Sequence, residues 1–485
     1  MRELLNKQHL RQLELVEYLS YNTCTIADVM KEFSYHIQTV QSYIYEINRI
    51  IAPLEIRIDE KKVASIYYPE NYSIEYIYSR FIYESSEYEL LEKIFFDETK
   101  SIDEWAEELF LTSSTLRRSI NRMNLELKKE SISIEGKKLM LAGNEAKIVH
   151  FMVRLFLEKY VDNEVPFNSK QLKAIEILLK YYTKNKSISL NFKDYEIIKN
   201  FVLVSIVRVQ NQHYVYDHEQ DLTKYNNRIL KSKMVNLIFK NLFKLELSDE
   251  LIYRFTYTIT SGEYLSAFDD IHAISKNKIK VIENVKMIEE IVDQIKIKLE
   301  IPIKNREHLV LSLYNEYAMQ YGKNFILYDF SKEFTLSLEK LFPDVTLILK
   351  KMLRPLSLTG EEWEIFQYIY LFATHCESFF NIIRTREKKV KIALFSTNDL
   401  EYLKFLKEEI YLKFSYHFEV EILNDYSIKD FKLKKYDFDI VITNISGLKF
   451  ENYLTLCFPI FPQQENWVML HEAYEKIIKQ NNEKK

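Results

Sequence analysis

Apolar residues recur at helical spacing in two stretches that lie 76 positions apart. Residues 25–48 read TIADVMKEFSYHIQTVQSYIYEIN, and residues 101–124 read SIDEWAEELFLTSSTLRRSINRMN. The stretches align without a gap, and the alignment runs on from EIRIDEKKVAS, residues 55–65, to SISIEGKKLML, residues 131–141. Such self-similarity at a fixed distance indicates two copies of one module.

In each copy the pattern predicts a short helix with a defined start. Thr25 and Ser101 are N-cap residues, and Asp28 and Glu104 complete a capping box three positions later. We expect this first helix to end near Ser34 in one copy and Leu111 in the other.

A second helix and a hairpin are predicted to follow. The helix should begin near His36 or Thr112, and its buried face should carry the apolar residues Val40, Ile44 and Ile47, or Leu116, Ile120 and Met123. Alternating stretches around DEKK and EGKK predict a hairpin, with Gly136 suited to its turn. Two helices followed by such a hairpin form a winged helix-turn-helix.

The rest of the chain divides into a helical middle and a β-containing end. From LMLAGNEAKIVHFMVRLFLEKY, residues 139–160, to about Arg386 the pattern is a series of long amphipathic segments, which predicts two helical domains with a seam within residues 266–280. After TREKKV, the runs KVKIALFST, FEVEIL and FDIVITNIS alternate with helical segments, which predicts a small parallel α/β sheet. The predicted domains are residues 1–70, 71–160, 161–280, 281–386 and 387–485.

Composition agrees with a mainly α, multidomain chain. At 485 residues the chain is too long for a single core, and 6 glycines with 8 prolines favour helices joined by polar turns. Cys24, Cys376 and Cys457 form no CxxC pair, and no histidine has metal-ligand spacing, so we expect no metal, no cofactor and no disulfide. No apolar run has the length of a membrane span and no signal peptide is recognisable, so we expect a cytoplasmic protein.

Charge is what distinguishes the two copies. The chain carries a formal net charge of -4, yet residues 111–138 hold seven basic residues and three acidic ones, whereas residues 36–62 hold four of each. The second helix of such a module enters the major groove. The expected DNA contacts are Gln38, Thr39, Gln41, Ser42 and Tyr45 in the first copy, and Ser113, Ser114, Thr115, Arg117, Arg118, Asn121, Arg122, Lys137 and Lys138 in the second. A solvated basic face, or a module that binds protein, is the alternative.

Two further groups of residues each have two interpretations. His308 and His375 are either structural histidines or regulatory ones. Phe458, Phe461 and Trp467 either complete the core of the last domain or are partly exposed and join two copies in a homodimer, perhaps together with the second helical domain. The loop STNDLE after the first predicted strand has no cysteine and no glycine, so we expect no catalytic residue there and no enzyme.

The order of these parts, with patterns such as LAGNEAKIVHFM, resembles the Mga/AtxA family of virulence regulators of Gram-positive bacteria over essentially the whole chain. The resemblance implies a dimeric transcription regulator that binds promoter DNA and responds to carbohydrate status. It also implies that the helical pair is similar to phosphotransferase-system regulation domains (PRDs) and the last domain to an EIIB component, with a phosphocarrier protein as a further partner. The alternative function is a phosphocarrier relay that uses the PRD-like and EIIB-like domains.

Overall fold

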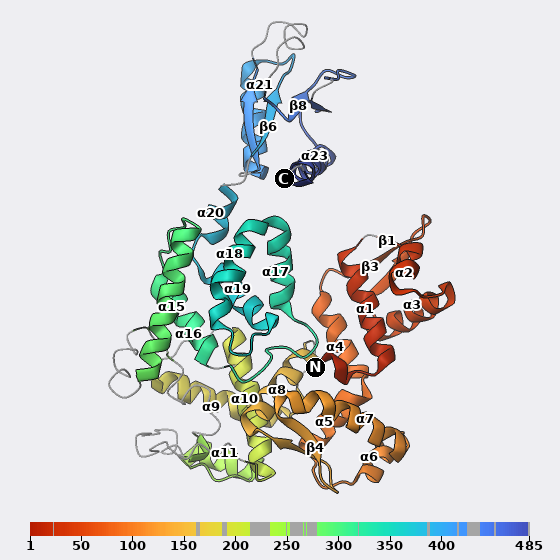
Figure 1. The fold of residues 1–485 in the computed structure, drawn as a ribbon, viewed down its shortest axis with the longest axis vertical. Helices are drawn as coiled ribbons and strands as arrows, with labels where there is room; N and C mark the ends of the chain where they lie inside the picture. The colour runs from red at the N-terminus through yellow and green to blue at the C-terminus, as the bar shows by residue number, and fades with distance from the viewer. Residues whose placement is uncertain are drawn as a thin grey trace. The chain divides into compact units, whose positions relative to one another are not determined.

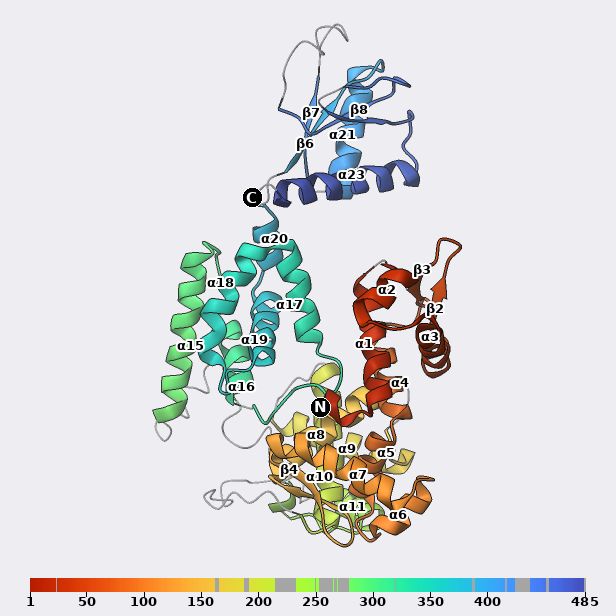
Figure 2. The ribbon, with the colours of Figure 1, turned by 45° about the vertical axis from the view of Figure 1, so that its right-hand side comes forward.

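A computed structural model describes residues 1–22, 24–161, 165–186, 192–213, 233–248, 250–252, 265, 268, 279–318, 320–385, 389–414, 417–423, 437–450 and 453–483. The chain forms two compact units, Met1–Cys376 and Glu377–Lys485. The described elements are mostly helices, together with three small sheets (Figures 1 and 2). The mainly α, multidomain character predicted from the sequence is therefore confirmed, and the division into five domains stays a prediction.

The first copy of the repeat forms a helical group with a three-stranded sheet. Its elements are η1 (Arg2–Leu4), α1 (Lys7–Tyr21), β1 (Cys24–Thr25), α2 (Ile26–Phe33), α3 (Ile37–Ile51), β2 (Glu55–Ile58) and β3 (Val63–Tyr67). The strands pair antiparallel in the order β1-β3-β2. The predicted hairpin is the β2-β3 pair.

The second copy repeats this order of elements. It consists of α4 (Ile74–Glu84), α5 (Ser86–Phe96), α6 (Ile102–Glu108), α7 (Ser113–Leu127), η2 (Lys128–Glu130), β4 (Ile132–Glu135) and β5 (Met140–Gly143). An isolated antiparallel bridge from Ser101 to Lys138 corresponds to the pairing of Thr25 with Val63 in the first copy. At the turn of the hairpin, Gly136 has φ 93°, and a Cβ there would lie 2.4 Å from the Lys138 carbonyl oxygen.

The helices of the two copies lie 76 positions apart in the sequence, as predicted. Both capping boxes form, and α3 and α7 differ by 76 positions at each end. Ser34 and Phe110, which also lie 76 apart, both adopt a left-handed conformation with φ 55°. The first helix of the second copy ends at Glu108, three residues before the position predicted near Leu111, because the chain already turns at Leu109 and Phe110.

An asparagine near the end of each second helix holds the first strand of the hairpin. Asn48 Nδ2 donates to the Ile56 carbonyl (3.1 Å), and the Ile56 amide donates to Asn48 Oδ1 (2.7 Å). Asn124 makes the same two bonds with Ile134 (3.0 and 2.8 Å). Ile56 therefore corresponds to Ile134 and not to Ile132, so the gapless alignment is wrong by two residues in this strand. The cause is the additional turn η2 after α7.

Replacing Asn124 with alanine should lower the free energy of unfolding by roughly 1 to 3 kcal/mol, because two hydrogen bonds to a strand backbone are lost together. Chemical denaturation measures this change. Asn121→Ala is the matched control, since Asn121 lies exposed on the same helix and its loss should change stability by about 0.5 kcal/mol or less. Equal stabilities of the two variants would contradict the role given to Asn124.

The remaining elements in the described part of the first unit are helical. They are α8 (Glu145–Lys159), α9 (Ser169–Lys186), α10 (Phe192–Gln210), α11 (Lys233–Phe243), α15 (Ile279–Lys298), α16 (Arg306–Ala318), α17 (Phe330–Leu341), α18 (Pro343–Leu353), η5 (Arg354–Leu356) and α19 (Glu362–His375). α10 packs on α8 and α9, while α15–α19 pack on one another. Most of the predicted seam at residues 266–280 lies outside the described residues.

A buried arginine fastens α10 to the second copy of the repeat. The Arg208 guanidinium donates to Glu145 on α8 (2.7 Å), to Glu98 (2.9 Å) and to the Leu141 carbonyl of β5 (3.0 Å). A buried guanidinium is stable only when its charge and its N–H groups are satisfied in this way. The helical region is therefore joined directly to the hairpin of the second copy.

The second unit contains a four-stranded parallel sheet. Its elements are α20 (Phe379–Thr385), β6 (Val390–Leu394), α21 (Leu400–Phe414), β7 (Phe418–Ile422), β8 (Ile440–Thr443), β9 (Leu454–Cys457) and α23 (Gln464–Glu483), with strand order β7-β6-β8-β9. The three predicted strands and the parallel arrangement are confirmed. Strand β9 was not predicted, because its four residues, LTLC, follow directly on polar residues and lack a β-branched run.

Candidate nucleic-acid interface

Helix α7 presents a polar and basic face to solvent. Thr112 caps the helix by accepting from the Thr115 amide (3.1 Å), and Leu116, Ile120, Met123 and Leu127 bury the opposite side. Of the predicted contacts on this helix, the exposed ones are Ser114, Thr115, Arg117, Arg118 and Asn121, while Ser113 is half-buried. Helical periodicity thus brings these five side chains to one surface.

Several cations at this surface have no carboxylate partner. Five basic side chains of the second copy are exposed and form no ion pair with any described residue: Arg117, Arg118, Lys128, Lys137 and Lys138. By contrast, Lys129 pairs with Glu126, three residues earlier in the chain. Unpaired exposed cations are the groups that neutralise phosphates and release counterions on binding DNA.

Arg122 differs from the prediction. It is half-buried, its Nη2 lies 2.5 Å from a carboxylate oxygen of Glu87 on α5, and its Nη1 donates to the Leu5 carbonyl. The Glu87 side chain is only 3% exposed. Arg122 therefore holds α7 against α5 and the N-terminal segment, and it does not belong to the exposed face that carries Arg117 and Arg118.

In the first copy, the residue equivalent to Arg122 also contacts the supporting helix, but it carries the opposite charge. Glu46, 76 positions before Arg122, accepts from the side-chain amides of Gln8 and Gln12 on α1, each at 2.5 Å. A glutamate at a DNA-contacting position would repel phosphate. The alignment of Glu46 with Arg122 therefore indicates that this position faces the protein, which the prediction of Arg122 as a DNA contact did not take into account.

The first copy presents a polar face with little charge. Gln38, Gln41, Ser42 and Tyr45 are exposed, Tyr45 to 75%, and Thr39 is half-buried. In its hairpin, Lys61 and Lys62 are exposed and form no ion pair with the described residues. Like Lys137 and Lys138 of the second copy, these two lysines lie at the turn of the hairpin, and they were not among the predicted contacts.

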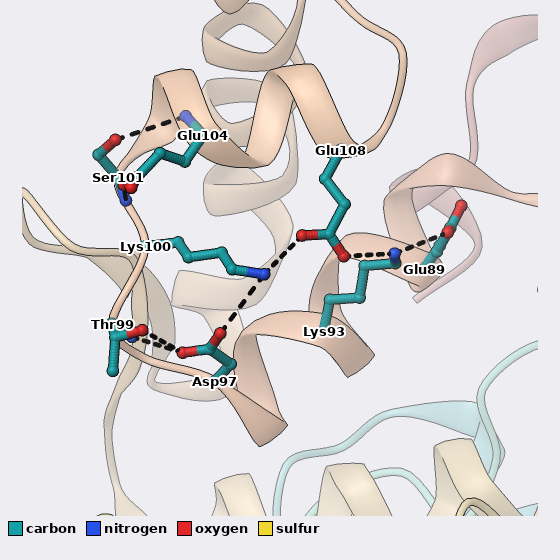
Figure 3. A network of polar contacts seen from close by, with 8 residues as sticks. All are labelled: Glu89, Lys93, Asp97, Thr99, Lys100, Ser101, Glu104 and Glu108. Atoms are coloured by element: carbon teal, nitrogen blue, oxygen red, sulfur yellow. Dashed lines mark hydrogen bonds and ion pairs between the residues drawn. The ribbon is translucent and has the colours of Figure 1, made fainter.

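A network of ion pairs positions α6, the helix before α7 (Figure 3). Lys93 and Lys100 both reach Glu108, at 2.8 and 2.6 Å, and Lys100 also pairs with Asp97 at 3.5 Å. Hydrogen bonds from the two lysines hold the pKa of Glu108 below its usual value. These lysines are therefore already neutralised, and they fasten α6 to the end of α5.

The two histidines singled out in the sequence lie side by side. The rings of His308 on α16 and His375 on α19 are stacked, with centroids 5.8 Å apart and an interplanar angle of 17°. Burial lowers the pKa of His375, and the neighbouring His308 adds to this effect. His375 Nδ1 is also 3.0 Å from the Thr374 hydroxyl. The arrangement places an exposed imidazole directly on a half-buried one.

Neither a metal site nor a membrane-spanning helix is found in the described part of the chain. No group of three or more His, Cys, Asp or Glu side chains there has the geometry to hold a metal ion. Among the same residues, every helix is too short or too polar to cross a bilayer.

Comparison with known proteins agrees with this geometry. Residues 70–156, from just before α4 into α8, match the Mga helix-turn-helix domain. The fold and this match define a helix-turn-helix DNA-binding protein of the transcription-regulator class.

Three relatives extend the similarity along the chain. A trans-acting regulator of Streptococcus pneumoniae is 23% identical, with 93% of this chain and 94% of that protein aligned. From Bacillus anthracis, the anthrax toxin expression trans-acting positive regulator is 21% identical (98% and 99% aligned), and the capsule synthesis positive regulator AcpB is 22% identical (64% and 66%). The matched domain and these relatives support the Mga/AtxA family of regulators for this chain.

Proposed function

We propose that this protein is a transcriptional activator that binds promoter DNA through two winged helix-turn-helix modules, residues 1–70 and 71–160. The observation that carries the proposal is the set of exposed, unpaired cations on α7 and the β4-β5 hairpin. The matching polar face of α3 supports a second point of contact, with Gln41, Ser42 and Tyr45 reaching bases or backbone. Activation is inferred from the names of two relatives, which are positive regulators.

We also propose recognition partly through DNA shape, because the positive charge is concentrated in one module and most of its unpaired cations suit phosphate contacts. We expect the full-length protein to bind curved, A·T-rich DNA about tenfold more tightly than straight, G·C-rich DNA of equal length. A gel shift at fixed salt measures both affinities. Equal affinities would contradict shape readout, and no binding to either fragment or to genomic promoter DNA would overturn the proposed function itself.

We also propose that the helical region senses the state of the cell, with His308 and His375 as its regulatory residues. The stacked rings support this role, since a charge placed on exposed His308 would act directly on His375. A response to carbohydrate status through PRD-like domains, with a phosphotransferase-system phosphocarrier as donor, is the form of regulation that similarity to this family favours.

Finally, we propose a homodimer held through the C-terminal unit. Its surface carries exposed Ile460 and Phe461, at 70% and 63%, and Phe461 stacks on Phe405 of α21. Phe458 is buried and Trp467 is half-buried in the core, so of the three aromatics named from the sequence only Phe461 offers substantial apolar surface.

A truncation that ends at Arg386 should dimerise at least about tenfold more weakly than the full-length chain, because it lacks this apolar surface. Sedimentation velocity over a concentration series compares the two proteins. A Phe461→Ser variant of the full chain should shift the equilibrium in the same direction. Identical dissociation constants for all three would place the dimer contact elsewhere.

The competing function, a phosphocarrier relay, has no support in these observations. The loop between β6 and α21, Phe395–Asp399, contains neither cysteine nor histidine to carry a phosphoryl group. A relay would also leave the repeated modules and their basic face without a role.

A further inference from the structure

A cavity of about 720 Å³ lies between α8, α9 and the first half of α10. Sites for small molecules typically have volumes of roughly 300 to 1,000 Å³. Much of its wall is apolar and comes from all three helices and the segment that joins α8 to α9, through Leu157, Val165, Leu172 and Ile197. These side chains are half-buried, so a ligand in the cavity would remove further apolar area from water.

The rim of the cavity adds an aromatic ring and a cation. Phe192, at the start of α10, is 82% exposed, and Lys193 beside it is also exposed. An exposed aromatic side chain next to a half-buried apolar wall is a typical feature of a ligand-binding surface.

Lys193 is the cation at the cavity that forms neither an ion pair nor a hydrogen bond with a described carboxylate, although its charge acts on the Glu316 carboxyl group and lowers the pKa of that group. Lys199, which also lines the cavity, forms an ion pair with Glu196 at 2.5 Å. Arg154 lies near the half-buried carboxyl groups of Glu158 and Glu316. Lys193 forms no ion pair with any described residue, and its ammonium group lies 5.7 Å from the centre of the Phe330 ring.

We propose that this cavity binds a small amphipathic carboxylate. The apolar body of the ligand lies against the wall of Leu157, Leu172 and Ile197, and its carboxylate accepts from the Lys193 ammonium group. A single cation without an ion pair suits a monoanion, whereas a phosphate ester would bring a second negative charge with no partner. A neutral ligand would leave Lys193 unused.

Decanoate is a suitable probe, because it combines a flexible apolar chain with one carboxylate. Isothermal titration calorimetry of the full-length protein should show saturable binding of one decanoate per chain. Decanol, which lacks the charge, and acetate, which lacks the chain, should each bind at least about tenfold more weakly. Absence of saturable decanoate binding, or equal binding of decanol, would overturn the proposal.

Variants locate the site. Lys193→Ala should weaken decanoate binding about 10- to 100-fold, the range expected for a lost charge-assisted hydrogen bond, while Lys193→Arg should retain most of it. Lys173→Ala is the matched control, since Lys173 is an exposed lysine of α9 that does not line the cavity. Leu172→Trp should abolish binding by filling the cavity. If that variant does not fold, the comparison of Lys193→Ala with Lys173→Ala still decides, and equal affinities for those two variants would refute the site.

Discussion

Replacing Arg117 and Arg118 together with alanine is expected to weaken binding to promoter DNA about 10- to 100-fold at moderate salt. Both side chains are exposed on α7 and neither has a carboxylate partner among the described residues. If each contacts one phosphate, the slope of log K against log salt concentration should fall by about 2 units. Gel shifts or fluorescence anisotropy over a salt series measure the affinity and the slope together.

Two single variants separate this effect from damage to the fold. Lys129→Ala removes an exposed cation of the same module that is already paired with Glu126, so DNA affinity should change about twofold or less. Arg122→Ala should instead destabilise the protein by roughly 2 to 3 kcal/mol, because the Glu87 carboxylate is left buried and unpaired. If the double variant kept the affinity and the salt slope of the parent, α7 could not be the recognition helix.

The second large effect concerns a stripe of half-buried polar residues on α8. His150, Arg154 and Glu158 follow one another at intervals of four residues and therefore lie on one face of the helix. All three contact the segment that leads from α16 into α17. His150 Nε2 is 3.1 Å from the Lys323 carbonyl, Arg154 donates to the Asn324 side chain (3.2 Å), and Glu158 accepts from successive backbone amides of residues 326–328.

Burial raises the pKa of Glu158 to about 7, even though the three amides and Arg154 favour its ionised form. In the unfolded chain this carboxyl should titrate near 4.5. The folded state therefore holds the proton more tightly, and stability declines as the pH rises through the interval between these values. The unfolding free energy of the parent minus that of Glu158→Gln should fall by roughly 3 kcal/mol between pH 4.5 and pH 7. Above pH 7 this difference should stay constant.

His150 provides the matched control, because burial lowers its pKa and thereby changes stability with pH in the opposite direction. Burial, with a contribution from Arg154, lowers the pKa of His150 from 6.5 to about 3. The unfolded state then takes up the proton first, so stability declines as the pH falls below about 6.5. The unfolding free energy of the parent minus that of His150→Gln should therefore rise with pH, whereas the corresponding difference for Glu158→Gln should fall. Urea unfolding between pH 5 and pH 8 measures both, and a flat difference for Glu158→Gln would show that its carboxyl is not buried as described.

The repeated helices were predicted well because their signals are local. A capping box, a turn and an apolar stripe each depend on residues within a few positions, and Thr25 with Asp28, or Ser101 with Glu104, form the predicted bonds. The register of the hairpin was wrong because the length of the connection after α7 decides it, and the short turn η2 has no clear signal of its own in the sequence.

Contacts between distant parts of the chain could not be predicted. Arg122 pairs with Glu87, which lies 35 positions earlier in the chain. The sequence of an amphipathic helix does not indicate whether a basic residue will contact a phosphate or a buried carboxylate. The stacking of His308 on His375 likewise depends on how α16 packs against α19. For the candidate site, the sequence identified the exposed residues of α7 and overestimated the number of its free arginines.

The opposite charges of Glu46 and Arg122 determine which pieces of the two modules are interchangeable. In α1, the neutral amides of Gln8 and Gln12 contact Glu46, whereas in α5 the Glu87 carboxylate contacts Arg122. If α7 were grafted into the first module, its guanidinium would meet amides in place of a carboxylate, and the reverse graft would set Glu46 against buried Glu87. A chimera with a new binding specificity must therefore exchange each recognition helix together with its own supporting helix, α1 with α3 and α5 with α7.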